Sequence, residues 1–289
     1  MPVEPKRMPF LQHFHELRKR LTVIAVVLFV LALVFYSAPV YKFLMDIFLA
    51  PVRSYLPGGK LTVLGPFEQM TFRFKVAFMA ALIASMPVIL YEIFSFLTPA
   101  LKPREKKWVF PTVIAAVLLF ASGVSFAYFV ILGPAFQWLS SQGAGVVDSM
   151  ASASQYFSGI SLLLVGFGIG FELPLVVFYL IGLNIVKYDK LRASWRYVYV
   201  IIVIVASIAT PDWSPWTMGG LAVALIVLYE ASLASARVIY GKRIEEQRKE
   251  DAEYEAYYAD DESDSDEPKK TRKQKLIERA AQEKSKREE

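Results

Sequence analysis

The sequence predicts an all-α integral membrane protein, with six transmembrane helices in residues 1–240 and a charged tail in residues 241–289. The first observation behind this fold class is the distribution of charge. The tail carries 13 Lys/Arg and 16 Asp/Glu, whereas the 240 residues before it carry only 19 and 11. The first 240 residues therefore have about one charge in eight residues, whereas soluble domains have roughly one in four. The second observation is a set of six apolar runs, at about 21–37, 76–97, 109–133, 157–183, 197–210 and 217–236.

A bilayer core about 30 Å thick needs roughly 20 apolar residues in a helix. The runs are continuously apolar and do not alternate, which indicates helices and not barrel strands. The positive charge of the first 240 residues therefore favours a membrane protein over a nucleic-acid-binding one. Cysteine is absent, which excludes a disulfide framework, a thiolate metal site and a Cys nucleophile.

The first run follows a basic stretch and could be a secretory signal peptide. Its apolar core is about 16 residues long, no small-residue cleavage site follows it, and five further runs come after it. We therefore interpret it as a retained span.

Lys and Arg near the span ends predict the orientation. The 98–108 loop carries four in 11 residues and the 184–196 loop four in 13, whereas the 138–156 and 211–216 loops carry none. The 38–75 segment has five, spread over 38 residues. Both termini and the two short basic loops are predicted to be cytoplasmic.

The fifth and sixth runs are short. Residues 197–210 give about 21 Å of helix, and the stretch from Trp216 to Tyr229, just before Glu230, is also 14 residues long. Either the bilayer is thinner here or the helix ends lie among protein. Alternatively, Glu230 pairs or snorkels and the sixth span continues. The tail beyond residue 240 has too little apolar surface to order itself and is predicted to be disordered.

Glu172 lies inside the fourth run, in residues 166–174 (GFGIGFELP). An ionisable group there costs several kcal/mol unless it faces a cavity or a partner. It is either a functional group or a protonated carboxyl bonded to a neighbouring helix. Gly166 and Gly170 suit close helix packing better than a phosphate loop, and Pro174 should bend the helix.

Two acidic residues lie among basic ones. Glu16 stands before the first span, on an amphipathic stretch, at i,i+4 spacing from Arg20. It is either a plain surface ion pair or a ligand for a cation. Glu105 is the one acid of the 98–108 loop, where neighbouring basic residues could simply neutralise it. On the opposite side, turn chemistry explains Asp212.

Catalytic patterns are missing from the sequence. His13 and His15 are the two histidines and fall on different helix faces, and no carboxylate grouping has metal-ligand spacing. No nucleophile elbow, phosphate loop or zinc-helix motif occurs. The chain is therefore predicted not to be an enzyme and to need no metal or other cofactor.

A set of short motifs follows in a fixed order over residues 8–240. The N-terminal motif consists of Leu11, Glu16, Arg18 and Arg20. The others are 85–92 (SMPVILYE), Phe96, 99–101 (PAL), Glu105, 126–130 (FAYFV), 171–174 (FELP), 210–212 (TPD) and 228–230 (LYE). This ordered set resembles the TatC family, the multi-spanning receptor subunits of the twin-arginine protein translocase.

The resemblance implies a glove-like, concave bundle in a bacterial plasma membrane, a location that the lack of a transit-like N-terminal segment also favours. It further implies binding of folded precursors through a signal peptide with paired arginines, and recruitment of single-span TatA- and TatB-type subunits for export driven by the proton-motive force. The resemblance also implies self-association in the receptor complex and no nucleic-acid partner. The arginine site would be Glu16 and Glu105, assisted by Arg18, Phe96 and Lys107. These carboxylates suit guanidinium, which they bind through two parallel hydrogen bonds.

The resemblance gives roles to three further regions. Glu172 would line the concave face near the inserted signal peptide, and the outer loop around Pro66 and Glu68 would cap that face. The two short spans would dock partner helices. Where the family has two prolines before the aspartate and a glutamine soon after, this chain has Thr210, Pro211, Asp212 and Trp216. Ser207 and Thr210 are the candidate substitutes for the missing polar contact.

Two other functions remain open at this stage. A proton-coupled small-solute transporter would use Glu172 as a relay, although such proteins usually have paired broken helices and more than one buried ionisable group. A structural anchor would bind partners through residues 241–289. A membrane enzyme ranks last, for want of catalytic groups.

Overall fold

The computed structural model describes residues 10–56, 61–63, 65–97, 109–142, 152–210 and 214–263. These residues are almost entirely helical, with one isolated bridge between Thr62 and Ser152. In chain order the elements are α1 (Phe10–Tyr36), α2 (Ala38–Leu49), the 3-10 turn η1 (Arg53–Tyr55), α3 (Pro66–Leu97), α4 (Val109–Phe126), the π-helical turn η5 (Ala127–Ile131), α5 (Leu132–Ser141), α6 (Ala153–Gly170), α7 (Leu173–Gly182), α8 (Tyr188–Ala193), α9 (Trp195–Ala209) and α10 (Pro215–Ser263).

The all-α fold class is confirmed. Five stretches are long and apolar enough to cross a membrane, namely 14–36, 66–96, 109–141, 153–182 and one in α10, and α9 is a shorter apolar helix of 15 residues. Each predicted apolar run falls, to within a residue, on one of these six stretches. Several helices extend beyond their apolar runs, because their first turns carry polar residues that do not raise the hydropathy. The first ten residues of α3 are an example.

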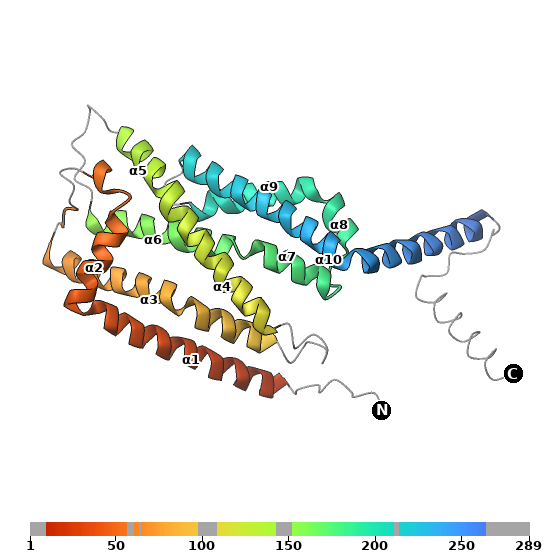
Figure 1. Ribbon diagram of the computed structural model, residues 1–289, viewed down its shortest axis with the longest axis horizontal. Helices are drawn as coiled ribbons and strands as arrows, with labels where there is room; N and C mark the ends of the chain where they lie inside the picture. The colour runs from red at the N-terminus through yellow and green to blue at the C-terminus, as the bar shows by residue number, and fades with distance from the viewer. Residues whose placement is uncertain are drawn as a thin grey trace. The chain divides into compact units, whose positions relative to one another are not determined.

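The antiparallel pair of α1 and α3 is the most extensive helix contact in the described chain, and the two lie side by side in Figure 1. Arg73 of α3 closes one end of this pair. Its Nε and Nη2 donate to the carbonyl oxygen of Tyr36 at 3.1 and 2.7 Å. The guanidinium also lies 4.6 Å from the Tyr36 ring centroid and 5.2 Å from that of Tyr41. A carbonyl left without a partner at the end of α1 is satisfied in this way.

The core lies where α3, α4 and α6 pack together. One apolar cluster joins Met86 and Leu90 of α3 to Ala116 and Phe120 of α4. A second centres on Phe157 of α6, which is fully buried. Its ring makes edge contacts with Phe48 at 5.5 Å and with Phe72 at 5.7 Å between centroids.

Two glycines let α4 and α6 approach closely. A Cβ on Gly168 would lie 2.5 Å from Cε2 of Phe120, and one on Gly123 would lie 2.5 Å from the carbonyl oxygen of Phe167. By contrast, the nearest atom to a Cβ on Gly166 would be 3.8 Å away. A Cβ on Gly170 would lie 3.1 Å from a Cδ atom of Leu225 of α10. Close packing was the right interpretation of this glycine run, but Gly168 makes the tightest contact.

The fourth apolar stretch is interrupted at Phe171 and Glu172, where α6 ends and α7 begins. Pro174 stands in the first turn of α7, where its missing N–H leaves no intrahelical bond unmade. The structure thus shows an interruption of the helix just before the proline that was expected to bend it.

By compactness the chain divides into two units, one up to Val238 and one from Ile239. The second unit begins inside α10, which continues to Ser263, although the sequence led us to expect disorder beyond residue 240. Residues 242–263 contain neither Gly nor Pro, and the exposed pair Glu245–Lys249 is spaced i,i+4 at 3.8 Å. Good helix formers with such pairs extend a helix that is already nucleated.

Candidate functional site

A cluster of three charged residues lies near the N-terminal end of α1. Arg20 Nη2 donates to Glu16 Oε1 at 2.5 Å, and Arg20 Nη1 donates to Glu92 Oε2 at 3.0 Å. The three side chains are between 13 and 23% exposed. The i,i+4 spacing places Glu16 and Arg20 on one face of α1, and the antiparallel packing of α3 brings Glu92 to that face.

Arg20 bridges the two carboxylates through its two terminal nitrogens. Its Nε is buried and has no hydrogen-bond partner among the described residues. Each carboxylate takes part through one oxygen atom. The site therefore holds two negative charges and one positive charge.

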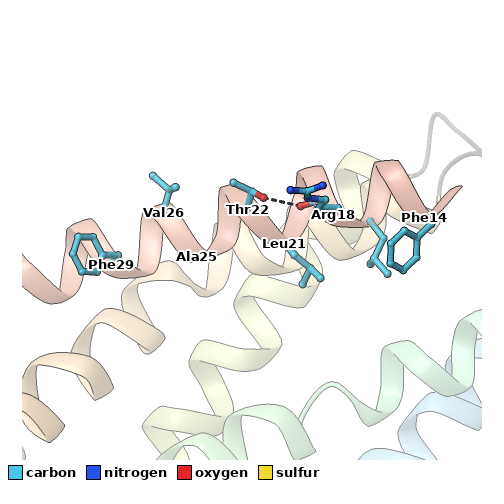
Figure 2. Close-up of a pocket in the computed structure, with 8 residues that line it drawn as sticks. Phe14, Arg18, Leu21, Thr22, Ala25, Val26 and Phe29 are labelled. Atoms are coloured by element: carbon cyan, nitrogen blue, oxygen red, sulfur yellow. Dashed lines mark hydrogen bonds between the residues drawn. The ribbon is translucent and has the colours of Figure 1, made fainter. Parts of the chain in front are cut away.

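Arg18 lies on a different face of α1 from Glu16 and Arg20. It lines an open apolar groove of about 720 Å³, and its carbonyl oxygen accepts a hydrogen bond from Thr22 Oγ1 at 2.8 Å (Figure 2). The rest of the lining is mostly apolar and belongs to α1: Phe14, Leu17, Leu21, Ala25, Val26 and Phe29. An exposed apolar face of this kind is typical of a helix that lipid covers. The structure therefore brings Glu16 together with Arg20 rather than with Arg18.

Of the other residues predicted for the arginine site, Phe96 is half-buried one helical turn beyond Glu92, near the end of α3. Glu105 and Lys107 lie outside the described residues. Their place relative to Glu16 stays a prediction.

Glu172 lies at the junction between α6 and α7. Its side chain is half-buried, and its Oε1 is buried with no hydrogen-bond partner in the described part of the chain. One alternative for Glu172 is a protonated carboxyl bonded to a neighbouring helix, but no described residue forms a hydrogen bond with that oxygen. A buried oxygen without a partner is costly and needs an explanation.

Pro66 begins α3, and Glu68 in its first turn connects the preceding segment to α6. The Glu68 carboxylate accepts a hydrogen bond from Ser152 Oγ and a longer one, of 3.3 Å, from the backbone N–H of Ser154. The backbone N–H of Ala153 donates to the Thr62 carbonyl oxygen at 2.9 Å. Glu68 thus joins the first turn of α3 to the start of α6, and Thr62 joins the segment before α3 to the same place.

The predicted partner-docking residues lie near the end of α9. Ser207 is half-buried and contacts the Met218 sulfur at 3.1 Å. Thr210 is buried, and its hydroxyl donates to the Ala206 carbonyl oxygen at 3.0 Å. Asp212 lies outside the described residues. The Thr210 hydroxyl therefore already bonds within its own helix.

Two polar groupings were missed by the sequence reasoning. The first is the contact of Glu92 with Arg20. In the second, Lys75 of α3 donates to Ser154 Oγ at 2.7 Å and to Ser158 Oγ at 2.9 Å on α6. Lys75 directly precedes the predicted span 76–97 and Glu92 lies inside it, and a charge in either position could have drawn attention to these residues. Their partners belong to other helices, and no spacing along the chain reveals such partners.

Glu230 pairs with a neighbour, which was one of the alternatives for the sixth span. Its carboxylate accepts from Arg192 Nη1 at 2.6 Å and from the Tyr199 hydroxyl at 2.7 Å. The hydrogen bond to Glu230 raises the pKa of Arg192. Helix α10 continues through Glu230 without interruption.

The described residues contain no group of three or more His, Asp or Glu side chains that could hold a metal ion. The apolar helices and the paired charges instead define a multi-pass membrane protein whose polar groups are suited to binding. Residues 12–223 match the family model described as Sec-independent protein translocase protein (TatC). The chain belongs to the TatC family, whose members are components of a protein translocase and not enzymes.

Individual relatives agree with this membership. The chain is 33% identical over 250 residues to the Sec-independent protein translocase protein TatC of Deinococcus radiodurans, covering 86% of this chain and 93% of that one. It is 32% identical over 237 residues to the TatC of Escherichia coli K12, covering 81 and 90%. A crystal structure of the twin-arginine translocase receptor TatC in detergent superposes with a TM-score of 0.67 at 30% identity, covering 78% of this chain and 99% of that one.

Proposed function

We propose that this chain is the core receptor subunit of a twin-arginine translocase. It binds the twin-arginine signal peptides of folded precursor proteins on the cytoplasmic side of a bacterial plasma membrane. It then recruits single-span subunits of the TatA and TatB type for export driven by the proton-motive force. Receptor complexes contain more than one copy of the chain. The proposal assigns the paired-arginine site to Glu16 and Glu105, with Arg18, Phe96 and Lys107 around them.

The observation that carries this proposal is that Glu16 already binds a guanidinium. Its carboxylate accepts from Arg20 at 2.5 Å in a half-buried position. A carboxylate so placed is partly protected from water, which strengthens its interaction with a cation. Arginine is preferred over lysine at such a site because its planar fork matches a carboxylate.

The orientation follows from the positions of the basic residues. The loops at 98–108 and 184–196 are rich in Lys and Arg, and such loops face the cytoplasm. The N-terminal end of α1 and the C-terminal end of α3 then lie on the cytoplasmic side, where a precursor first meets the translocase.

Glu172 and the outer segment have supporting roles in this proposal. The half-buried side chain of Glu172, one oxygen of which has no hydrogen-bond partner among the described residues, binds a polar group of the inserted signal peptide. Pro66 and Glu68 cap the outer side, where Glu68 joins α3 to α6. Partner helices dock against the short spans near Ser207, Thr210 and Asp212, where the exposed residues of α9 include Ile204 and Ile208.

Site-specific crosslinking of a twin-arginine signal peptide to the full chain in membranes tests the proposal. The comparison includes the wild type, Glu16→Ala and Glu105→Ala, each with a paired-arginine peptide and its paired-lysine version. We expect strong labelling only when both the arginines and the two glutamates are present. Equal labelling in all combinations would show that the carboxylates are ordinary ion pairs, and substrate-dependent flux by the purified chain would then favour the transporter hypothesis centred on Glu172.

A further inference from the structure

The chain's own Arg20 occupies the carboxylate that the proposed function assigns to a substrate arginine. It bonds to Glu16 of its own helix at 2.5 Å and to Glu92 of α3 at 3.0 Å. Two carboxylates around one guanidinium give the cluster a formal charge of −1. One further guanidinium would therefore neutralise the net negative charge of the cluster.

The hydrogen bonds of the cluster are also incomplete. The strongest arginine–carboxylate pairs use two parallel N–H···O bonds. Arg20 instead gives one nitrogen to each carboxylate, and its buried Nε has no partner among the described residues. Arg20 thus holds both acids without making the best pair with either.

We infer that Arg20 is the resting-state ligand of Glu16, and that Glu92 keeps Arg20 paired when Glu16 turns to an incoming signal-peptide arginine. This inference rests on the proposed function and names two positioning residues for it. Before binding, Arg20 is shared between Glu16 and Glu92. After binding, Glu16 pairs with the peptide arginine and Arg20 pairs with Glu92 alone.

Burial explains why Glu92 is necessary for this exchange. The Arg20 side chain is 19% exposed, and a charge with so little access to water is costly without a counter-ion. If Glu92 were neutral, releasing Glu16 would leave the Arg20 guanidinium unpaired. With Glu92 present, each half-buried charge keeps a partner in both states.

The inference predicts opposite effects for the two partners of the cluster. Glu92→Gln should weaken binding of a paired-arginine peptide, by about tenfold, since a lost charged hydrogen bond has effects of that order. Arg20→Gln removes the internal competitor and should strengthen binding several-fold. The double variant Arg20→Gln/Glu92→Gln removes competitor and counter-ion together and should bind at least as well as the wild type.

The measurement is fluorescence anisotropy of a labelled synthetic twin-arginine signal peptide, titrated with the full-length chain in lipid nanodiscs. Thermal unfolding of each variant is measured in parallel. Arg73→Gln is the matched control, because it removes an arginine that joins α1 to α3 at the other end of the same helix pair. It should lower the thermal stability but leave the peptide affinity within about twofold of the wild type, since it removes no hydrogen bond of the cluster.

The inference would be overturned if Arg20→Gln bound the paired-arginine peptide more weakly than the wild type, or if the double variant bound it as weakly as Glu92→Gln. Either result would indicate that the cluster only packs α1 against α3. Unchanged binding by Glu92→Gln would overturn the inference as well. If Arg20→Gln alone does not fold, the double variant, which keeps the net charge of the cluster, decides between the two outcomes. A wild-type chain that binds the paired-lysine peptide equally well would instead contradict the proposed function, and this inference with it.

Discussion

Arginine side chains join helices at several points of the described structure. Arg20 connects α1 to α3 through Glu92, Arg73 connects α3 to the last carbonyl of α1, and Arg192 connects α8 to α10 through Glu230. A guanidinium is suited to this because it presents five donors in a rigid plane and stays charged. In the first 240 residues, which carry so few charges, each such contact fixes the register of one helix against another.

The sequence predicted part of this residue-level detail. The i,i+4 spacing of Glu16 and Arg20 offered their pairing as one of two alternatives, and the structure shows that pair. Glu92 escaped notice as a site residue because its link to Arg20 spans 72 residues and depends on how α1 and α3 pack. The same reason explains why the bond from Lys75 to two serines of α6 was missed.

At this scale, Glu68 gives a direct test of how the first turn of α3 is joined to the start of α6. Glu68→Ala removes the acceptor for the Ser152 hydroxyl and the Ser154 N–H. We expect it to destabilise the protein by about 1–2 kcal/mol, read as a lower midpoint in thermal unfolding in detergent. Glu68→Gln keeps an acceptor oxygen and should cost less. The neighbouring exposed residue gives the control Gln69→Ala, and equal losses for Glu68→Ala and Gln69→Ala would contradict the assignment.

At the scale of single elements, the lengths of the apolar runs predicted the positions of the helices well, but they did not predict where the polar ends of these helices lie. The six apolar runs all fall on helices, because continuous apolar stretches of this length have few alternatives in a bilayer. The π-helical turn η5 and the start of α3 at Pro66 were not predicted. Neither depends on hydropathy, so a hydropathy pattern cannot report them.

The contact between α4 and α6 supplies the prediction at this scale. Gly168→Ala would place a methyl group 2.5 Å from the Phe120 ring, and overpacking of a core costs about 1–3 kcal/mol. The matched control is Gly166→Ala in the same helix, where the nearest atom is 3.8 Å away and the helix gains about 1 kcal/mol from replacing Gly by Ala. Thermal unfolding should show opposite shifts for the two variants. Shifts of the same sign and size would contradict the packing derived for α6.

At the scale of the whole molecule, the charge distribution separates the chain into an apolar part and a charged part. The composition could predict that residues 1–240 belong in a membrane, because no soluble surface can be built from so few charges. Composition could not predict that α10 continues to Ser263. Helix extension depends on the preceding turn already being formed, and low hydropathy alone cannot distinguish an exposed helix from a disordered tail.

The receptor proposal places binding in residues 1–240 and none in the tail. A chain that stops after Tyr240 should therefore still insert into membranes and bind the paired-arginine peptide within about twofold of the full-length affinity, because sites far from a change are little affected. Export of a folded reporter precursor should survive as well. Loss of peptide binding by a correctly inserted truncated chain would favour the anchor hypothesis, in which residues 241–289 bind the partners.

The central claim is that signal-peptide arginines bind at the Glu16 end of α1 and α3, and disulfide mapping tests it most directly. The chain has no cysteine, so single cysteines can be introduced at the exposed positions Lys19, Ile93 and Ile208. A signal peptide carrying one cysteine beside its arginine pair should crosslink to Lys19→Cys and Ile93→Cys, but not to Ile208→Cys on α9. Adding Glu16→Gln should abolish both crosslinks. Equal crosslinking at position 208, or crosslinks that persist without the Glu16 carboxylate, would contradict the account.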